Sequence, residues 1–296
     1  MSHPQRRVWF ITGTSTGFGR ALTEVVLAKG ETVVATARTP SVLADLVAQY
    51  PSDRLLALKL DITQPSEVAE AFERAREAFG RIDVVVNNAG CGHAGEFESM
   101  DDEMGRAIME TNFWGTVNVT RQALKFFREV NPKGHGGRLL QNSSVLGVVG
   151  KPAFSFYIAS KFALEGLTES LAQELDPAWN IKVTLIEPGW FRTNMKEVAQ
   201  WTQPHPAYQN PELPISRLRA SWESFVCPGD AHKGAEAFYK IAALPDPPLH
   251  FPLGEDAVAQ IQAKLDEFGG VLKEYRSWSE GLLTDNNPET SDQDAQ

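Results

Sequence analysis

Four polar side chains have the types and the spacing needed to move a proton to or from an oxygen atom: Asn112, Ser144, Tyr157 and Lys161. Tyr157 and Lys161 are four residues apart at the start of a helical pattern, so their side chains share one helix face. At ~4 Å and an effective dielectric of ~20, an ammonium and a phenolate attract by roughly 4 kcal/mol, which would lower a phenol pKa of about 10 by up to roughly three units. We therefore expect Tyr157 to act as an acid–base group near neutral pH.

Ser144 stands thirteen residues before Tyr157, where a predicted strand ends. A hydroxyl at that place can donate a hydrogen bond to an oxygen that gains negative charge, so Ser144 and Tyr157 are predicted to share one substrate oxygen. Each residue also has a purely structural interpretation: Ser144 can end a strand, Tyr157 and Lys161 can be four apart by chance, and Asn112 can satisfy backbone groups within a helix. Their occurrence together, in this order, favours the catalytic interpretation.

A glycine-rich turn follows the first predicted strand and leads directly into a helical pattern. Glycines allow a sharp turn and a close approach to a pyrophosphate, while the helix N-terminus offers free N–H groups and the positive end of its dipole. Three glycines can also simply make a tight strand-to-helix turn. The placement nevertheless favours a dinucleotide site formed by Gly13, Ser15, Thr16, Gly17, Phe18 and Gly19.

The same turn contains the pattern G-x-S-x-G of the nucleophile elbow in α/β-hydrolases, with Ser15 in the place of the nucleophile. In those enzymes the elbow follows several strands, and an acid and then a histidine come later in the chain. Here the pattern follows the first strand, and no downstream histidine stands in a context that singles it out. A hydrolase is therefore only a minor alternative.

The end of the second predicted strand indicates which dinucleotide would bind. An acidic residue about 20 positions after the glycine turn grips the ribose in NAD sites, but this chain has Ala37 and Arg38 there. Ala37 removes the repulsion that a carboxylate would exert on a 2′-phosphate, and Arg38 offers a guanidinium fork to the phosphate oxygens. We expect NADP(H) to be favoured over NAD(H). The alternative is that Arg38 is an ordinary solvated arginine before a turn.

Short runs of β-branched residues alternate with longer helical patterns along most of the chain. The runs predict buried parallel strands at residues 8–12, 32–37, 55–60, 84–87, 138–142 and 182–186, and the patterns predict helices at 17–29, 66–79, 102–130 and 157–175. Such alternation favours a single α/β domain over residues 1–283, with a doubly wound parallel sheet and helices on both faces. The aromatic, proline-interrupted segment 190–230 is predicted to cover the substrate.

The composition excludes several classes of function. The 296 residues carry 38 acidic and 28 basic side chains, a net charge of −10, which disfavours nucleic acids and anionic membranes as partners. No run approaches the ~20 apolar residues of a membrane span. The two cysteines, Cys91 and Cys227, form neither a disulfide framework nor a metal-binding pattern. We expect a cytoplasmic protein with no metal and with a disordered acidic tail over residues 284–296.

Taken together, these motifs resemble those of the short-chain dehydrogenase/reductase family over roughly residues 7–257. The segments 89–95 and 253–257 resemble the branch of hydroxysteroid dehydrogenases and carbonyl reductases. The resemblance implies a Rossmann-type sheet of seven parallel strands. Besides the glycine turn and the four polar residues, it rests on Asp61-Ile62, Asn87-Asn88-Ala89-Gly90, and Pro188-Gly189 with Thr193.

The family resemblance implies a hydride transfer between a nicotinamide and a carbonyl or secondary alcohol. Tyr157, which would also touch the cofactor, would exchange the proton of the substrate oxygen while Ser144 orients that oxygen. Lys161 would hold the nicotinamide ribose and acidify Tyr157, and Asn112 would position a water that relays protons. The other matched residues would contact the cofactor at the adenine (Asp61, Ile62), along the cleft (Asn88, Ala89, Gly90) and at the nicotinamide (Pro188, Gly189, Phe191, Thr193).

Two aromatic residues near the expected cleft, Phe154 and Trp190, favour a bulky apolar or aromatic substrate. The same residues can instead pack the covering segment against the body of the protein. A regulator that senses NADP(H) without chemistry is the alternative on the same fold, although such binders usually lack the tyrosine or the lysine. The resemblance further implies a homodimer or homotetramer assembled through the helices at 102–130 and 157–175.

Overall fold

The computed structural model describes residues 6–283. Seven parallel strands of this part of the chain form one sheet in the order β11-β7-β6-β4-β1-β2-β3. The strand order reverses between β1 and β4, which is where doubly wound sheets bind ligands beyond the carboxyl ends of their strands. The strands are β1 (Val8–Ile11), β2 (Thr32–Ala37), β3 (Leu55–Lys59), β4 (Val84–Asn87), β6 (Gly137–Asn142), β7 (Ile181–Pro188) and β11 (His250–Leu253).

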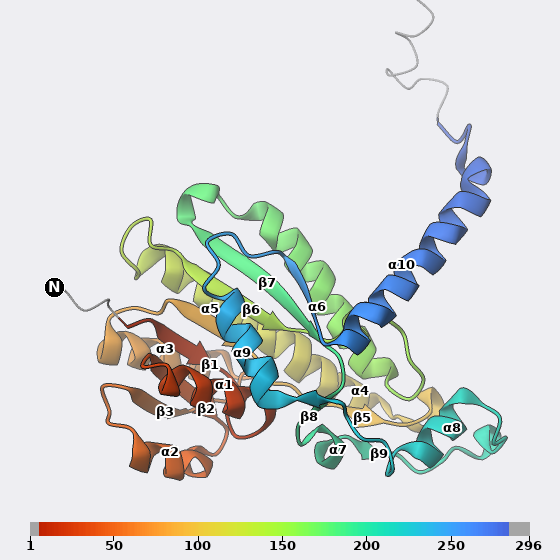
Figure 1. Ribbon diagram of the computed structural model, residues 1–296, viewed down its shortest axis with the longest axis horizontal. Helices are drawn as coiled ribbons and strands as arrows, with labels where there is room; N and C mark the ends of the chain where they lie inside the picture. The colour runs from red at the N-terminus through yellow and green to blue at the C-terminus, as the bar shows by residue number, and fades with distance from the viewer. Residues whose placement is uncertain (1–5, 284–296) are drawn as a thin grey trace, which may run out of the picture.

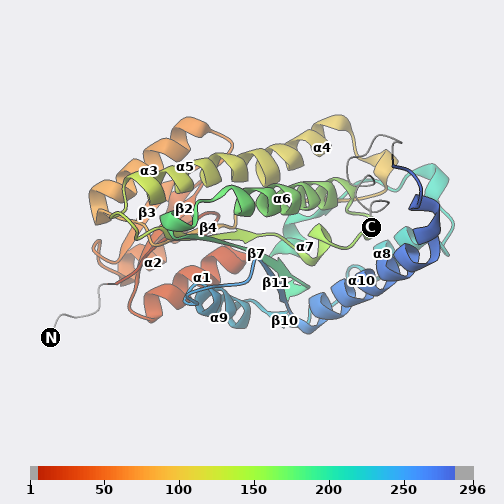
Figure 2. The same cartoon turned by 90° about the horizontal axis from the view of Figure 1, so that it is seen from above.

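Helices cover both faces of the sheet, as the alternating pattern predicts, and Figure 2 shows the three layers. On one face lie α1 (Gly17–Ala28) and α9 (Ala231–Ile241), which pack on Trp9 and Val33. On the other lie α3 (Pro65–Phe79), α5 (Thr116–Glu129) and α6 (Ser155–Glu174). There Phe10 stacks on Phe72 with ring centroids 4.3 Å apart. Alternate side chains of one strand therefore supply both cores, as expected for a sheet buried on two sides.

The helix predicted over 102–130 is confirmed as one continuous helical run, but it is not α-helical throughout. The structure has α4 (Asp102–Met109), a π-helical segment (Glu110–Gly115) and then α5. At the end of this segment, a Cβ on Gly115 would lie 2.7 Å from Ile62 Cγ1, so the helix and the loop after β3 are in close contact. Apolar residues keep recurring every three to four positions on both sides of a π turn, so hydrophobic spacing alone does not reveal it.

The segment 190–230 contains short elements: β8 (Phe191–Arg192), α7 (Met195–Val198), β9 (Gln200–Trp201), α8 (Pro214–Ser221) and β10 (Gly229–Asp230). It is tied back to the body, because β9 pairs with β5 (His93–Ala94). Its aromatic rings gather in a core of their own, in which the Trp222 and Phe154 centroids are 5.7 Å apart. This segment is therefore a small packed layer over one end of the sheet.

The last described helix, α10 (Glu255–Tyr275), runs away from the body of the protein (Figure 1). The remaining short helix, α2 (Ala44–Gln49), lies between β2 and β3. Between residues 6 and 283, no helix combines the length and the hydropathy needed to cross a bilayer. The predicted acidic tail over residues 284–296 lies outside the described residues.

Candidate active site

Tyr157 and Lys161 come from the first turns of α6 and face the same region, as their spacing predicts. The Lys161 Nζ lies 5.7 Å from the centroid of the Tyr157 ring. The same amine donates a hydrogen bond of 2.7 Å to the main-chain carbonyl of Asn142, at the carboxyl end of β6. The helix and the central sheet thus fix the ammonium beside the phenol ring.

The pKa values of this pair differ from the sequence-based expectation. Burial raises the pKa of Tyr157, and the neighbouring Ser144 hydroxyl offsets this only in part. Burial also lowers the pKa of Lys161 to about 8, against the opposing effect of Glu165. The predicted fall in the phenol pKa is therefore wrong for this structure, because both groups are desolvated and the ammonium is directed at a carbonyl oxygen. At neutral pH the phenol holds its proton.

Ser144 caps a short 3₁₀ turn after β6 (Val145–Gly147), and its Oγ accepts a hydrogen bond of 3.1 Å from the Leu146 N–H. The hydroxyl is close enough to Tyr157 to oppose, in part, the rise that burial causes in the pKa of the phenol. Because Oγ serves as the acceptor in the cap, its own proton stays available for donation. The structure therefore brings Ser144 and Tyr157 together, as the order of the motifs predicts.

Asn112 lies in the π-helical segment and is fully buried. Its Nδ2 donates to the Cys91 carbonyl (2.8 Å) and to Ser160 Oγ (3.0 Å), and its Oδ1 accepts from the Cys91 N–H (2.8 Å). Ser160 Oγ in turn donates to the Tyr157 carbonyl (2.6 Å). Both amide hydrogens are thus engaged within the protein, so within this side chain only Oδ1 could contact the water that the family resemblance implies.

The glycine turn is closely fitted to the end of β4. Thr12 Oγ1 accepts hydrogen bonds from the N–H groups of Asn88 (2.9 Å) and Ala89 (3.0 Å). Asn88 Nδ2 donates to the carbonyls of Thr12 (2.8 Å) and Gly13 (3.1 Å). A Cβ on Gly19 would lie 2.3 Å from the Gly13 carbonyl oxygen, a distance that no side chain can occupy. Glycine at position 19 is therefore required by this packing.

The N-terminus of α1 fits an anionic group. Its cap residue Thr16 makes no side-chain capping bond, and the first turn holds no acidic residue. Gly13 and Gly17 have φ of +67° and +58°, which other residues rarely adopt. A Cβ on Gly17 would lie 3.4 Å from the Thr193 Cβ, so a residue predicted for the pyrophosphate and one predicted for the nicotinamide are neighbours. The exposed Ser15 and Thr16 complete a turn suited to a pyrophosphate.

A chain of hydrogen bonds joins this turn to Lys161. Asn142, whose carbonyl accepts from Lys161, donates from Nδ2 to Asn88 Oδ1 at 2.9 Å, and Asn88 donates to Gly13. The Asn142 Oδ1 is buried and accepts no hydrogen bond from the described residues. The predicted catalytic and cofactor residues therefore lie in one continuous region along the carboxyl ends of β1, β4 and β6.

The other predicted cofactor residues lie around this region in different settings. Arg38 is exposed directly after β2, whereas Ile62 is buried against the π-helical segment. Asp61 Oδ1 accepts from both the N–H (3.0 Å) and the hydroxyl (2.8 Å) of Thr63. The remaining four lie near the turn or after β7: Gly90 beside Asn112, Pro188 at the end of β7, Gly189 beside Asp256, and Phe191 against Phe18 at 5.0 Å.

The two residues predicted to line the substrate site are part of the aromatic core of segment 190–230. Phe154 is buried, and its ring centroid lies 6.1 Å from that of Trp190. Trp190 is half-buried and packs edge-on against Phe225 at 5.4 Å. Both residues therefore pack within the aromatic core. Because Trp190 keeps part of its surface exposed and Phe154 does not, Trp190 is the better candidate of the two for contact with a substrate.

The hydrolase alternative has no support in the geometry. In the described part of the chain, the histidines with polar partners contact residues far from Ser15: His135 contacts Asp83, His205 the Ala207 N–H, His232 Glu24 and His250 Glu187. None of these four histidines is thus placed to act as a base for Ser15.

Several residues of the site were not identified from the sequence. Asn142 and Cys91 act mainly through backbone groups, and such contacts leave no signal in residue types. Glu165 had a detectable signal, because it lies four residues after Lys161 on the same face of α6. It is buried, and its carboxylate acts on the Lys161 amine.

Comparison with known proteins agrees with this site. Residues 7–203 match the family model described as short chain dehydrogenase. An uncharacterised oxidoreductase of Schizosaccharomyces pombe is 41% identical over 93% of this chain and 91% of its own length. The crystal structure of a short-chain dehydrogenase from Streptomyces avermitilis superimposes with a TM-score of 0.85, at 37% identity, over 95% of this chain and 100% of that one.

Two further structures at 26% identity contain nicotinamide dinucleotides. A short chain dehydrogenase from Burkholderia cenocepacia holds NADP (TM-score 0.70, 91% of this chain and 97% of that one). A 3-ketoacyl-(acyl-carrier-protein) reductase from Brucella melitensis holds NADH (TM-score 0.67, 80% and 90%). The matched motifs, the sheet topology and these similarities show that the chain is an oxidoreductase of the short-chain dehydrogenase family.

Proposed function

We propose that this protein transfers a hydride between NADP(H) and a carbonyl or secondary alcohol on a bulky apolar substrate. The observation that carries the proposal is the meeting of Ser144, Tyr157 and Lys161 beside the glycine turn, to which Lys161 is joined through Asn142 and Asn88. A bound nicotinamide would supply or accept the hydride. The residues of the chain would bind the substrate and handle the proton.

Tyr157 is the proposed proton donor in the direction of carbonyl reduction. Its burial and raised pKa keep the phenol protonated at neutral pH, ready to donate to a carbonyl oxygen. Ser144 would donate a second hydrogen bond to the same oxygen and so stabilise the negative charge that develops there. The two hydroxyls would thus fix the carbonyl carbon in one position relative to the cofactor turn.

Lys161 and Asn112 have supporting parts in this proposal. With a pKa of about 8, the Lys161 amine is mostly protonated at pH 7 and can stabilise the phenolate left after proton transfer. Asn112 links the Cys91 backbone to Ser160 and, through it, to the Tyr157 carbonyl. It would therefore hold the start of α6 against the segment that follows β4.

A panel of ketones of increasing apolar size, followed by NADPH absorbance, tests the proposed activity. Turnover that rises with the apolar size of the ketone supports the bulky substrate, for which Trp190 is the proposed contact. If NADPH binds tightly but no ketone or alcohol is turned over, the alternative of a nicotinamide sensor gains support. Equal turnover of small and bulky ketones would contradict the substrate class but not the reaction.

The proposed preference for NADP(H) rests on Arg38, which is exposed at the carboxyl end of β2 next to the buried Ala37. Replacing both residues by aspartate should weaken NADPH binding by about 10- to 100-fold relative to NADH, because a charge-assisted hydrogen bond is lost and a repulsive charge is gained. Dissociation constants measured by fluorescence titration check this. Arg74→Asp, at another exposed arginine, is the control, and equal losses for both dinucleotides would contradict the role of Arg38.

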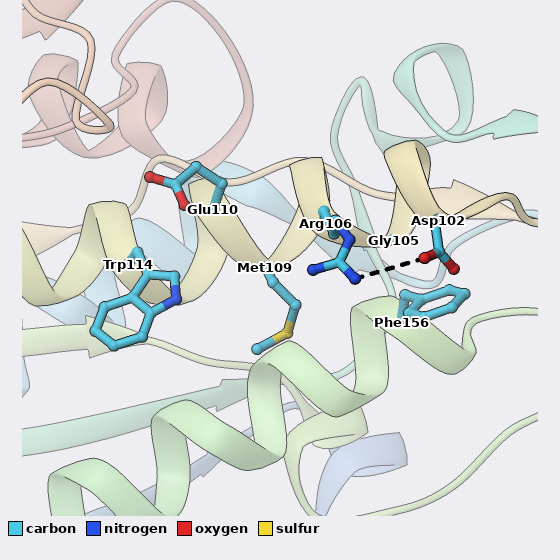
Figure 3. Close-up of a pocket in the computed structure, with 7 residues that line it drawn as sticks. All are labelled: Asp102, Gly105, Arg106, Met109, Glu110, Trp114 and Phe156. Carbon is cyan, nitrogen blue, oxygen red and sulfur yellow. Dashed lines mark hydrogen bonds and ion pairs between the residues drawn. The ribbon is translucent and has the colours of Figure 1, made fainter.

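We propose that the protein assembles as a homodimer or homotetramer through the outer faces of α4 and α6. A groove of about 460 Å³ on this surface is lined by residues of α4 and by Trp114 and Phe156 (Figure 3). Trp114 and Phe162 are 48% and 44% exposed, which is unusual for such large apolar side chains. The family resemblance implies the same helices.

Sedimentation tests the assembly. Trp114→Glu should shift the particle towards the 32.6 kDa of a single chain, because a charge would be buried in the interface. Val226→Glu, at an exposed apolar position of segment 190–230, is the control and should leave the mass unchanged. A wild-type particle of 32.6 kDa at micromolar concentration would contradict the proposal.

A further inference from the structure

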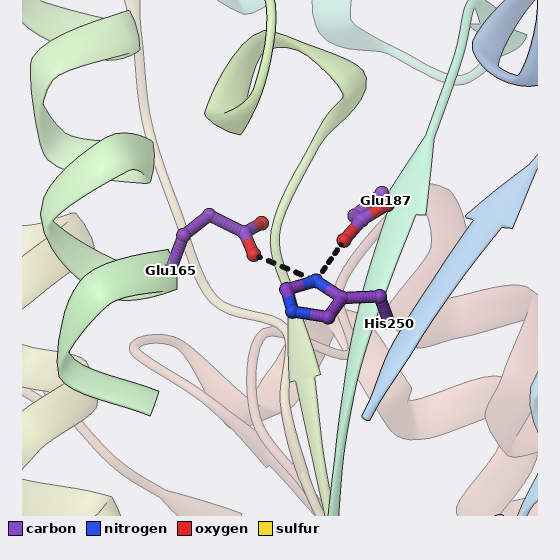
Figure 4. A group of neighbouring side chains, drawn as sticks. All are labelled: Glu165, Glu187 and His250. Carbon is purple, nitrogen blue, oxygen red and sulfur yellow. Dashed lines mark hydrogen bonds and ion pairs between the residues drawn. The ribbon is translucent and has the colours of Figure 1, made fainter. Parts of the chain in front are cut away.

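Three ionisable side chains converge one helical turn along α6 from Lys161 (Figure 4). Glu165 of α6, Glu187 of β7 and His250 of β11 each offer one donor atom, and these atoms all lie within 4.8 Å of one another. His250 Nδ1 lies 2.7 Å from Glu187 Oε1 and 3.6 Å from Glu165 Oε2. None of the three is assigned to proton transfer or to the dinucleotide.

Glu165 is the unexplained member of the cluster. Its side chain is only 7% exposed, and neither carboxylate oxygen accepts a hydrogen bond of standard geometry from the described residues. The nearest amine, that of Lys161, donates to the Asn142 carbonyl instead. Burial raises the pKa of Glu165 to about 7, and the nearby Ser143 hydroxyl opposes this only in part. A buried carboxylate whose oxygens accept no hydrogen bond is costly, and the His250 imidazole at 3.6 Å compensates its charge only in part, so the site favours a proton or a metal cation.

We propose that Glu165, Glu187 and His250 bind a divalent transition-metal ion, for which Zn²⁺ is the best chemical match. Imidazole nitrogen and carboxylate oxygen are both donor types that Zn²⁺ accepts, and its sites with open positions use three protein ligands. Ca²⁺ and Mg²⁺ prefer shells made entirely of oxygen, which disfavours them at a site that includes histidine. A water molecule would complete a four-coordinate shell.

The distances allow such a site with small side-chain movements. Ligands at about 2.0 to 2.2 Å from one tetrahedral ion lie roughly 3.4 Å from one another. The pair His250 Nδ1 and Glu165 Oε2 is already at 3.6 Å, and the Glu187 contact at 2.7 Å has to open by less than an ångström or so. Figure 4 shows both carboxyl groups directed at the same edge of the imidazole ring. The ion would lie between them.

A fourth acidic residue supports the orientation of the histidine. Glu169 Oε1 lies 3.6 Å from His250 Nε2, the ring nitrogen that faces away from Glu165 and Glu187. Histidines that bind a metal through one nitrogen usually present the other to a carboxylate, which fixes the ring. The ionisable groups around the cluster are therefore Lys161, Glu165 and Glu169 from α6, Glu187 from β7 and His250 from β11.

Two properties of the protein would change when the ion binds. First, the ion competes with protons for the imidazole and the two carboxylates, so its affinity should fall as the pH is lowered. Second, the ion would connect α6 to β7 and β11, so it should raise the melting temperature by binding the folded state alone. Neither effect depends on the proposed oxidoreductase reaction.

Titration of the tag-free protein with Co²⁺ at pH 8 tests the site, because ligation by histidine and carboxylates gives Co²⁺ characteristic visible absorption. We expect one Co²⁺ per chain, displaced by Zn²⁺, and an affinity at least tenfold lower at pH 5.5. Glu165→Gln and His250→Gln should each weaken binding by about 100-fold or more, and Glu169→Gln by about tenfold. His232→Gln, at an exposed histidine near Glu24, is the matched control and should bind as the wild type does.

The variants keep the test independent of folding. Glu165→Gln preserves the shape of the side chain and removes a buried charge, so in the absence of metal it should be at least as stable as the wild type at pH 8. His250 is 42% exposed and tolerates glutamine. Absence of stoichiometric binding, or binding that is the same in both variants as in the wild type, would overturn the proposal.

Discussion

Tyr157→Phe is expected to lower kcat for carbonyl reduction by about a thousandfold or more, since general acid catalysis contributes up to about 10⁴. The variant lacks only the hydroxyl, so the ring keeps its position beside the Lys161 amine and near Gly92, whose Cβ would lie 3.2 Å from the Tyr157 Cδ2. NADPH affinity should change by less than about fivefold. Stopped-flow measurement of NADPH oxidation, together with a binding titration, separates the two effects.

Tyr208→Phe is the matched control for this result. Tyr208 lies in segment 190–230, and its hydroxyl donates to the exposed Glu98 at 2.7 Å, away from Ser144 and Lys161. Its loss should leave kcat within a factor of about two. Turnover by Tyr157→Phe at the wild-type rate would remove Tyr157 from the proposed reaction, and an equal fall in both variants would indicate a general structural effect.

Gly19→Ala is expected to weaken the binding of both nicotinamide dinucleotides by about 100-fold or more. The added Cβ would lie 2.3 Å from the Gly13 carbonyl oxygen and 2.4 Å from Asn88 Nδ2. The first is a main-chain atom of the turn, and the second belongs to a side chain held by hydrogen bonds to the Thr12 and Gly13 carbonyls, so neither can move away freely. The turn would have to open, which separates α1 from the end of β4 and costs roughly 1 to 3 kcal/mol of stability. Calorimetric titration and thermal unfolding measure the two losses.

Gly166→Ala makes the same chemical change at an exposed position of α6 with no atom within 4 Å of the new Cβ. It should stabilise the protein by about 0.5 to 1 kcal/mol, because alanine favours the helix, and should leave dinucleotide binding unchanged. Wild-type affinity in Gly19→Ala would show that the pyrophosphate does not bind at this turn.

Much of the fold follows from local patterns in the sequence. Residues 32–37 and 84–87 are predicted as strands and form β2 and β4 with the same first and last residues. Runs of β-branched residues bounded by turns strongly favour strands. The position of the glycine turn before α1 is likewise fixed by the absence of a side chain at Gly13, Gly17 and Gly19. Where a backbone turn excludes every side chain, as at these glycines, the residue type alone therefore predicts the turn.

The ionisation of the site was not predictable in the same way. The spacing of Tyr157 and Lys161 correctly places them on one face, but the sign of a pKa shift depends on how much water surrounds the groups and on where the ammonium points. The Asn142 carbonyl that accepts the hydrogen bond from Lys161 comes from another element and is a main-chain group. Burial of the pair and a backbone acceptor are properties of the assembled fold, so neither appears in the spacing of two residues.

The π-helical segment at Glu110–Gly115 also determines where this helix can change its length. A π turn holds one residue more than the α-helix around it, and in an α-helix each residue turns the chain by about 100°. A single deletion within the segment would therefore remove the extra residue and leave α4 and α5 in their present phase. A deletion in α4 after Gly105 would instead rotate the two sides of the break by about 100°, so that Gly105, which now faces the ring of Phe156, and Asn112, which faces Cys91, could not both keep their partners. Natural variants of this helix should consequently change in length within the π-helical segment rather than within α4.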